Sequence, residues 1–79
     1  MPWYAFTPVP PSCDPCDPNN YTLVGSTPPP CPAPNIFLCA IQAMDNMGKP
    51  LIVPCAEIAY AISNSIDTAN VQLSNVRRC

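Results

Sequence analysis

The clearest run of apolar positions is residues 35–45, NIFLCAIQAMD. Read as a strand, it turns the side chains at 37, 39, 41 and 43 to one face and those at 36, 38 and 40 to the other. Both sets are almost entirely apolar, which favours a strand buried on both faces. A helix is an alternative reading, because Leu, Ala, Ile, Gln and Met all tolerate helical backbone.

Two further elements are expected after a turn at residues 45–50, DNMGKP. Residues 54–66 are predicted to form a helix, since Pro54 suits the first position and Glu57 complements the dipole. An apolar stripe supports it: Ile58, Ala59, Ile62 and Ile66.

A last strand is expected over residues 69–76, where apolar side chains at 71 and 73 alternate with polar ones. A helix between two strands predicts a right-handed parallel crossover. Two strands and one helix are too few to stand alone, so a third strand is needed. It would come from residues 20–24, NYTLV, or from the edge of another copy.

Prolines dominate residues 1–34, which hold eleven of the thirteen in the chain. Proline fixes φ and removes a donor, so this part is expected to be an extended arm with only the short strand 20–24. Three aromatic residues near the start are candidates for an interface with a neighbouring subunit: Trp3, Tyr4 and Phe6. They could equally cover the chain's own sheet. The chain thus divides into an arm, 1–34, and a small α+β domain, 35–79.

Six cysteines in 79 residues point to a disulfide framework and an oxidising compartment. So short a chain buries a small core, and bridges would contribute about 2–4 kcal/mol each. Six cysteines allow fifteen pairings, and Cys39 with Cys55 is the pair expected within the core. The candidates are Cys13, Cys16, Cys31, Cys39, Cys55 and Cys79. The last of these would tie down the terminus or join another subunit.

The C-x-x-C formed by Cys13 and Cys16 allows three interpretations: a redox pair, half of a metal site, or a structural bridge. Redox chemistry needs a helix start, but prolines and acidic residues flank this motif. A zinc ribbon needs a second C-x-x-C, and the sequence has neither that nor a histidine. The structural interpretation is favoured. Without histidine, a Ser–His or Cys–His pair is also excluded, so we expect no enzyme, no metal and no cofactor.

Charge is scarce, with three basic and five acidic residues and a formal net charge of −2. Three basic residues neutralise too few phosphates for nucleic-acid binding. No apolar run reaches the roughly 20 residues of a membrane span, and the start lacks the features of a signal peptide. An exported protein would then have this chain as its mature form, which leaves open whether Met1 is the initiator. The weakly charged surface favours cover by another subunit or by a glycan.

Two short motifs are glycosylation candidates. Asn20 begins the sequon Asn-Tyr-Thr, and Thr68 lies in an Asp-Thr-Ala pattern of the kind that some bacteria O-glycosylate. Both motifs are short enough to arise by chance, and each also fits an ordinary turn or helix end.

The runs DPNNYTLV, FLCAIQA and ANVQLSN, within residues 17–76, resemble segments of small secreted proteins of uncharacterised function in Bacteroidota. This chain departs from them by lacking an export signal and by carrying extra cysteines. The resemblance implies export and a surface or extracellular role, and it carries over no catalytic residue.

These observations predict a small, disulfide-stabilised α+β protein with a Pro-rich extended arm before a strand–helix–strand unit. The expected role is a structural subunit of an extracellular or cell-surface assembly, such as a filament, whose arm docks on a neighbouring copy. The alternatives are a secreted disulfide-rich binder or inhibitor, and an accessory subunit of a larger surface complex. For a binder, the best recognition loop is residues 45–50, with one acid and one base.

Overall fold

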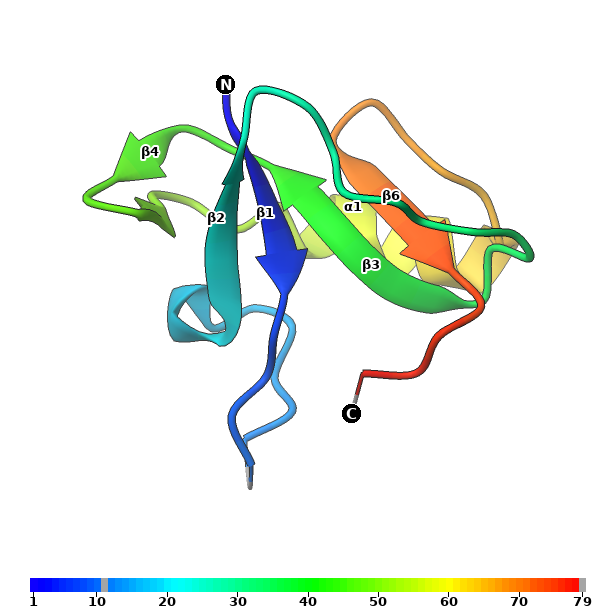
Figure 1. Ribbon diagram of the computed structural model, residues 1–79. Helices are drawn as coiled ribbons and strands as arrows, with labels where there is room; N and C mark the ends of the chain where they lie inside the picture. Colours follow the sequence, from blue (N-terminus) through cyan, green and yellow to red (C-terminus); the bar gives the residue numbers. More distant parts are fainter. Residues whose placement is uncertain (11, 79) are drawn as a thin grey trace.

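A four-stranded antiparallel sheet, in the order β2-β1-β3-β6, forms the centre of the computed structural model, which describes residues 1–10 and 12–78 (Figure 1). One helix, α1, packs against this sheet, and a two-stranded hairpin, β4-β5, lies beside it. The protein is therefore a small α+β fold. The elements in chain order are β1 Trp3–Phe6, the 3-10 turn η1 Pro18–Asn20, β2 Tyr21–Gly25, β3 Phe37–Gln42, β4 Asp45–Asn46, β5 Lys49–Pro50, α1 Cys55–Asn64 and β6 Val71–Ser74.

The first 34 residues do not form an extended arm, because both of their strands belong to this sheet. β1 lies inside it, paired with β2 on one side and with β3 on the other. Pro2 and Pro8 flank β1 without interrupting it, and three of the four residues of β1 are aromatic, a type with high strand propensity. The carbonyl of Pro2 still accepts a hydrogen bond from the Ala43 amide (3.2 Å).

The interval 35–45 contains a strand, β3, and not the alternative helix. Its partner β6 runs antiparallel to it, so the predicted parallel crossover is wrong. The helix runs opposite to β3, as in a crossover, but residues 65–70 then return to the first turn of α1, where Asn70 bonds to Glu57. β6 therefore starts at that end and runs in the direction of the helix. The predicted facing of 35–45 also fails, because the register shifts between Leu38 and Ala40. Leu38 and Ile41 therefore face the same core.

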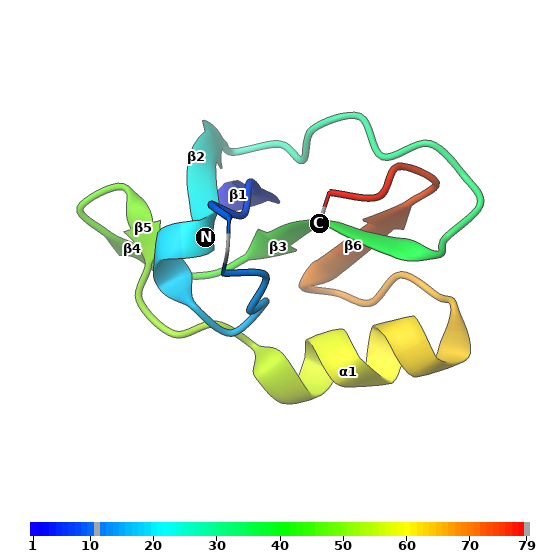
Figure 2. The ribbon, with the colours of Figure 1, turned by 90° about the horizontal axis from the view of Figure 1, so that it is seen from below.

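Each face of the sheet has its own cover (Figure 2). On one face α1 closes the main core, which contains Tyr4, Phe6, Tyr21, Leu38, Ile41, Ala43, Ile58, Ala61, Val71 and Leu73. On the other face Trp3, Cys39 and Ala40 form a second cluster, with Cys31 of the proline-rich loop packed against it. That loop, which joins β2 to β3, runs over the face opposite α1. The prolines thus lie on the surface that the sheet would otherwise expose.

The helix begins directly after Pro54 and buries Ile58 and Ala61 against the sheet. The predicted apolar stripe is therefore wrong beyond Ile58, because its other members, Ala59, Ile62 and Ile66, are exposed. It ends where Ser65 takes a left-handed conformation (φ 53°) and donates to the Ile62 carbonyl (3.3 Å). A residue in this conformation commonly stops a helix and satisfies its last carbonyls. Across the described ranges, 1–10 and 12–78, no helix has the length and apolar character needed to cross a membrane.

Candidate protein-binding surface

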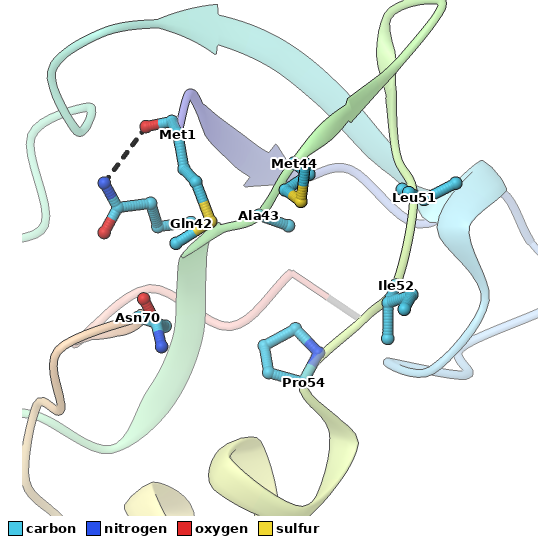
Figure 3. Close-up of a pocket in the computed structure, with 8 residues that line it drawn as sticks. All are labelled: Met1, Gln42, Ala43, Met44, Leu51, Ile52, Pro54 and Asn70. Atoms are coloured by element: carbon cyan, nitrogen blue, oxygen red, sulfur yellow. Dashed lines mark hydrogen bonds between the residues drawn. The ribbon is translucent and has the colours of Figure 1, made fainter.

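Large apolar side chains gather on the surface where β3 ends and α1 begins. Ile52 is 76% exposed, and Met1, Met44 and Leu51 are also exposed. We call these four residues the apolar end. They border an open pocket of about 200 Å³, whose remaining lining is Gln42, Ala43, Pro54 and Asn70 (Figure 3).

Backbone hydrogen bonds fix the two segments that carry the apolar end. The Leu51 amide donates to the Met44 carbonyl (2.8 Å), which closes the base of the β4-β5 hairpin. The Gln42 side chain donates through Nε2 to the Met1 carbonyl (3.0 Å), as Figure 3 shows. Met1 and Leu51 are thereby held on opposite sides of the Ala43–Met44 backbone, so the pocket walls belong to the ordered fold.

The hairpin itself is anchored by its two charged residues. The Asp45 carboxylate accepts from the Tyr4 hydroxyl (2.7 Å) and from the Gly48 amide (3.1 Å). Lys49 donates through Nζ to the Tyr21 carbonyl on β2 (2.6 Å). Burial, with the Asp45 hydrogen bond and charge, raises the pKa of Tyr4 to about 12, so this hydroxyl stays a donor at any physiological pH.

The size of the pocket limits what it can hold. Pockets for small-molecule ligands usually measure about 300–1,000 Å³ and bury most of the ligand. A pocket of about 200 Å³ with an open mouth suits one or two apolar side chains of another protein. Protein interfaces commonly use such anchors, in which one large side chain fills a pocket and the surrounding contacts exclude water.

Within the part of the chain that the structure describes, the Glu57 carboxylate accepts three hydrogen bonds. Its carboxylate accepts from the Thr68 hydroxyl, from the Asn70 amide (2.8 Å) and from the Asn70 side chain (3.1 Å). These hydrogen bonds, led by that of Thr68, hold the pKa of Glu57 below its ordinary value of 4.5. All three hydrogen bonds join the first turn of α1 to the loop before β6, so Glu57 stabilises the packing of this loop on the helix. The helix dipole predicted its place, but not these partners.

The cysteines pair differently from the expectation. Cys16 bonds to Cys55 (Cα–Cα 5.5 Å) and Cys31 bonds to Cys39 (Cα–Cα 6.0 Å), so the predicted Cys39–Cys55 pair is wrong. Cys39 faces the proline-rich loop on one side of the sheet, whereas Cys55 starts the helix on the other side. Cys13 is not a free thiol either, and the C-x-x-C is not closed on itself. Cys79 lies outside the described residues.

The aromatic interface candidates are inside the molecule. Trp3, Tyr4 and Phe6 are all buried in β1, with Trp3 on one face of the sheet and the other two in the main core. They cover the chain's own sheet, so they are not available for docking on a neighbour in this fold. The aromatic-rich run between Pro2 and Pro8 was the signal for this strand.

Both glycosylation candidates have their side chains engaged. Asn20 is only 2% exposed, and its amide nitrogen donates to the Ser12 hydroxyl (3.2 Å) and to the Asp14 carbonyl (2.9 Å). A glycan replaces one of the two hydrogens on that nitrogen, so it would break at least one of these bonds at a buried site. The folded chain therefore does not present this sequon. Thr68 is half-buried, and its hydroxyl is the one bound to Glu57.

No family model, curated protein or solved structure matches this chain. Within residues 1–10 and 12–78, no group of three or more Cys, Asp or Glu side chains is arranged to hold a metal ion. The apolar end is the surface that sequence reasoning missed. Its signal is the run Leu51-Ile52-Val53 between two prolines.

Proposed function

We propose that this protein is a structural subunit of an extracellular or cell-surface assembly, and that it contacts a neighbouring subunit through the apolar end. The observation that carries this proposal is the exposure of Met1, Met44, Leu51 and Ile52 around one open pocket. Scattered exposed apolar side chains are normal, but a cluster around a hollow is typical of an interaction site.

The chemistry of the remaining surface supports the same role. Only eight of 79 residues are charged, so this protein has little of the charged surface that keeps monomers apart in solution. Its two described disulfides suit an oxidising compartment such as the cell exterior. A non-enzymatic role fits a pocket lined mostly by aliphatic side chains, in which Gln42 and Asn70 are the polar members and both already hold hydrogen bonds.

A secreted binder or inhibitor is the second candidate, and the β4-β5 hairpin favours it. Met47, at the tip of this hairpin, is 97% exposed and has a left-handed backbone (φ 55°). A protruding apolar tip is a common recognition element. The charges on either side of it are less suited to recognition, because Asp45 and Lys49 are bound within the chain. An accessory role in a larger surface complex would use the apolar end in the same way.

The test is the sedimentation of the protein in the extracellular fraction of its source, with disulfides intact. An assembled subunit will sediment well above 8.5 kDa, and Ile52→Asp will return it to the monomer by placing a charge in the contact. Ile66→Asp is the matched control, because Ile66 is an exposed apolar residue beyond the far end of α1. A wild-type chain that sediments as a monomer contradicts the proposal. Loss of assembly in Met47→Ser but not in Ile52→Asp would favour the binder.

A further inference from the structure

The proline-rich loop between β2 and β3 has few amides with which to bond to the sheet. Its prolines, at positions 28, 29, 30, 32 and 34, have no amide hydrogen to donate. Asn75 donates to the Pro32 carbonyl (2.9 Å), and the Cys31–Cys39 disulfide joins the middle of the loop to β3. This disulfide is therefore a main attachment of the loop.

The same loop covers the smaller apolar cluster of the sheet. Trp3, Cys39 and Ala40 are buried there, and Cys31 packs against them. Figure 2 shows the loop running over this face, opposite α1. Opening the disulfide would release the loop and bring water to Trp3, which is the only tryptophan of the chain.

The two cysteines of this disulfide differ in their access to solvent. Cys39 is 0% exposed, whereas Cys31 is half-buried. In thiol–disulfide exchange, a thiolate attacks one sulfur and expels the other. Attack from solvent is thereby directed to the Sγ of Cys31, and the Sγ of Cys39 becomes the leaving group.

Arg78 lies beside that leaving group. Its Nη2 donates to the Sγ of Cys39 (3.8 Å), and its Nε is buried without a hydrogen-bond partner in the described part of the chain. A disulfide sulfur is a weak, uncharged acceptor, so this guanidinium is poorly satisfied while the disulfide is intact. A thiolate at Cys39 would give it an anionic acceptor. A neighbouring arginine lowers the pKa of a thiol, and a thiol of lower pKa leaves faster.

We propose that Cys31–Cys39 is a site of exchange with small-molecule thiols of the glutathione class, and that Arg78 assists the reaction. The thiolate of the small molecule forms a bond to the Sγ of Cys31 while the bond from Cys31 to Cys39 breaks. The electron pair of the broken bond stays on the Sγ of Cys39, and Arg78 pairs with the thiolate. One disulfide replaces another, so the step needs no further oxidant or reductant.

The charges around the other described disulfide, Cys16–Cys55, are less favourable for this reaction. Its Cys16 is the more exposed point of attack, but Asp14 and Asp17 flank it and repel an anionic thiolate. Its leaving group, Cys55, begins α1, where the helix provides a partial charge of about +0.5. Arg78 provides a full positive charge, so the surroundings favour exchange at Cys31–Cys39.

The experiment treats the folded, oxidised chain with an excess of reduced glutathione. Iodoacetamide in denaturant then blocks the freed thiols, and peptide mass spectrometry locates both modifications. We expect glutathione on Cys31 and the alkyl group on Cys39, with Trp3 fluorescence shifting to longer wavelength at the same rate. Arg78→Met should slow exchange at Cys31 about five- to tenfold, because Cys39 is then a poorer leaving group. Arg77→Met, which removes the same charge one residue away, is the matched control and should change the rate little.

A second measurement covers the case in which Arg78→Met loosens the end of the chain. In Cys31→Ser, the thiol of Cys39 is left without its partner. Its alkylation should reach half of the maximal rate at a lower pH than in the double variant Cys31→Ser/Arg78→Met. Glutathione found on the Cys16–Cys55 pair and not on Cys31, or exchange that Arg78→Met leaves unchanged or accelerates, overturns the inference. Equal pH dependence of the two alkylation rates would also overturn it.

Discussion

β6 and β2 are the two outermost strands of one sheet, and the chain covers their outer edges in different ways. The loop before β6 contains Asp67 and Thr68, which bond to the Leu73 amide and to the amide and carbonyl of Val71. The segment after β2 continues as Ser-Thr-Pro-Pro-Pro, and prolines have no amide to donate. That segment crosses to the far face of the sheet instead (Figure 2). The β4-β5 hairpin lies beside β2, where Lys49 donates to the Tyr21 carbonyl (Figures 1 and 2). One edge is thus covered by the adjacent loop, and the other by a hairpin from further along the chain.

The largest expected effect comes from proline at equivalent outward positions on the two edges. Leu73→Pro removes a buried amide that is bonded to Asp67 and also a core side chain, so we expect a loss of about 4 kcal/mol or more in unfolding free energy. Leu23→Pro removes an outward amide of β2 and should cost the monomer about 1 kcal/mol. Urea unfolding of dilute protein measures both losses. Leu73→Ala isolates the packing part, and equal losses for the two prolines would contradict the comparison.

The two described disulfides close loops of different lengths. Cys16–Cys55 joins the turn before β2 to the helix across 39 residues, whereas Cys31–Cys39 spans 8. Loop-closure entropy then predicts losses of about 4 and about 2.5 kcal/mol when each pair is replaced by alanine. Thermal unfolding of the two double variants gives the order. A larger loss for the Cys31–Cys39 pair would show that packing around buried Cys39 outweighs chain entropy.

Acid should loosen the loop beside β6 through Glu57. Because the folded pKa lies below the ordinary value of 4.5, the stabilisation is complete above that value and is lost as the pH falls through the folded pKa. Glu57→Gln should therefore cost about 1–2 kcal/mol near neutral pH, and the difference from wild type should shrink below about pH 4. Denaturant unfolding across this range measures it. Thr68→Ser, which keeps the donor, is the control, and a difference independent of pH would contradict the assignment.

The sequence predicted those elements whose residues show a local pattern of their own. Pro54 and Glu57 marked the start of the helix, and the dense apolar run marked β3. The apolar stripe marked the helical segment but not its buried face, since Ile62 and Ile66 are exposed. β1 was missed because the prolines on either side of Trp3–Phe6 suggested an extended arm, and only long-range pairing shows that they frame a central strand. The facing of β3 was missed because a register shift between Leu38 and Ala40 breaks simple alternation.

Features that depend on how distant segments pack together could not be predicted from local sequence patterns. Cys39 and Cys55 looked like a core pair because both lie near apolar segments, but the sheet separates them. The apolar end combines Met1 with Met44, Leu51 and Ile52, which are more than 40 residues further along the chain, and no local pattern unites them. The cover of β2 by the β4-β5 hairpin likewise depends on a contact between segments far apart in the sequence.

Hydrogen–deuterium exchange at the amides of Leu23 and Leu73 tests the contrast between the edges most directly. The Leu73 amide should be protected at every protein concentration, because its acceptor, Asp67, belongs to the same chain. The Leu23 amide points away from β1 and should exchange faster, because the hairpin beside β2 bonds to it through the Lys49 side chain and not through a backbone ladder. A Leu23 amide that is as protected as that of Leu73 would contradict the account.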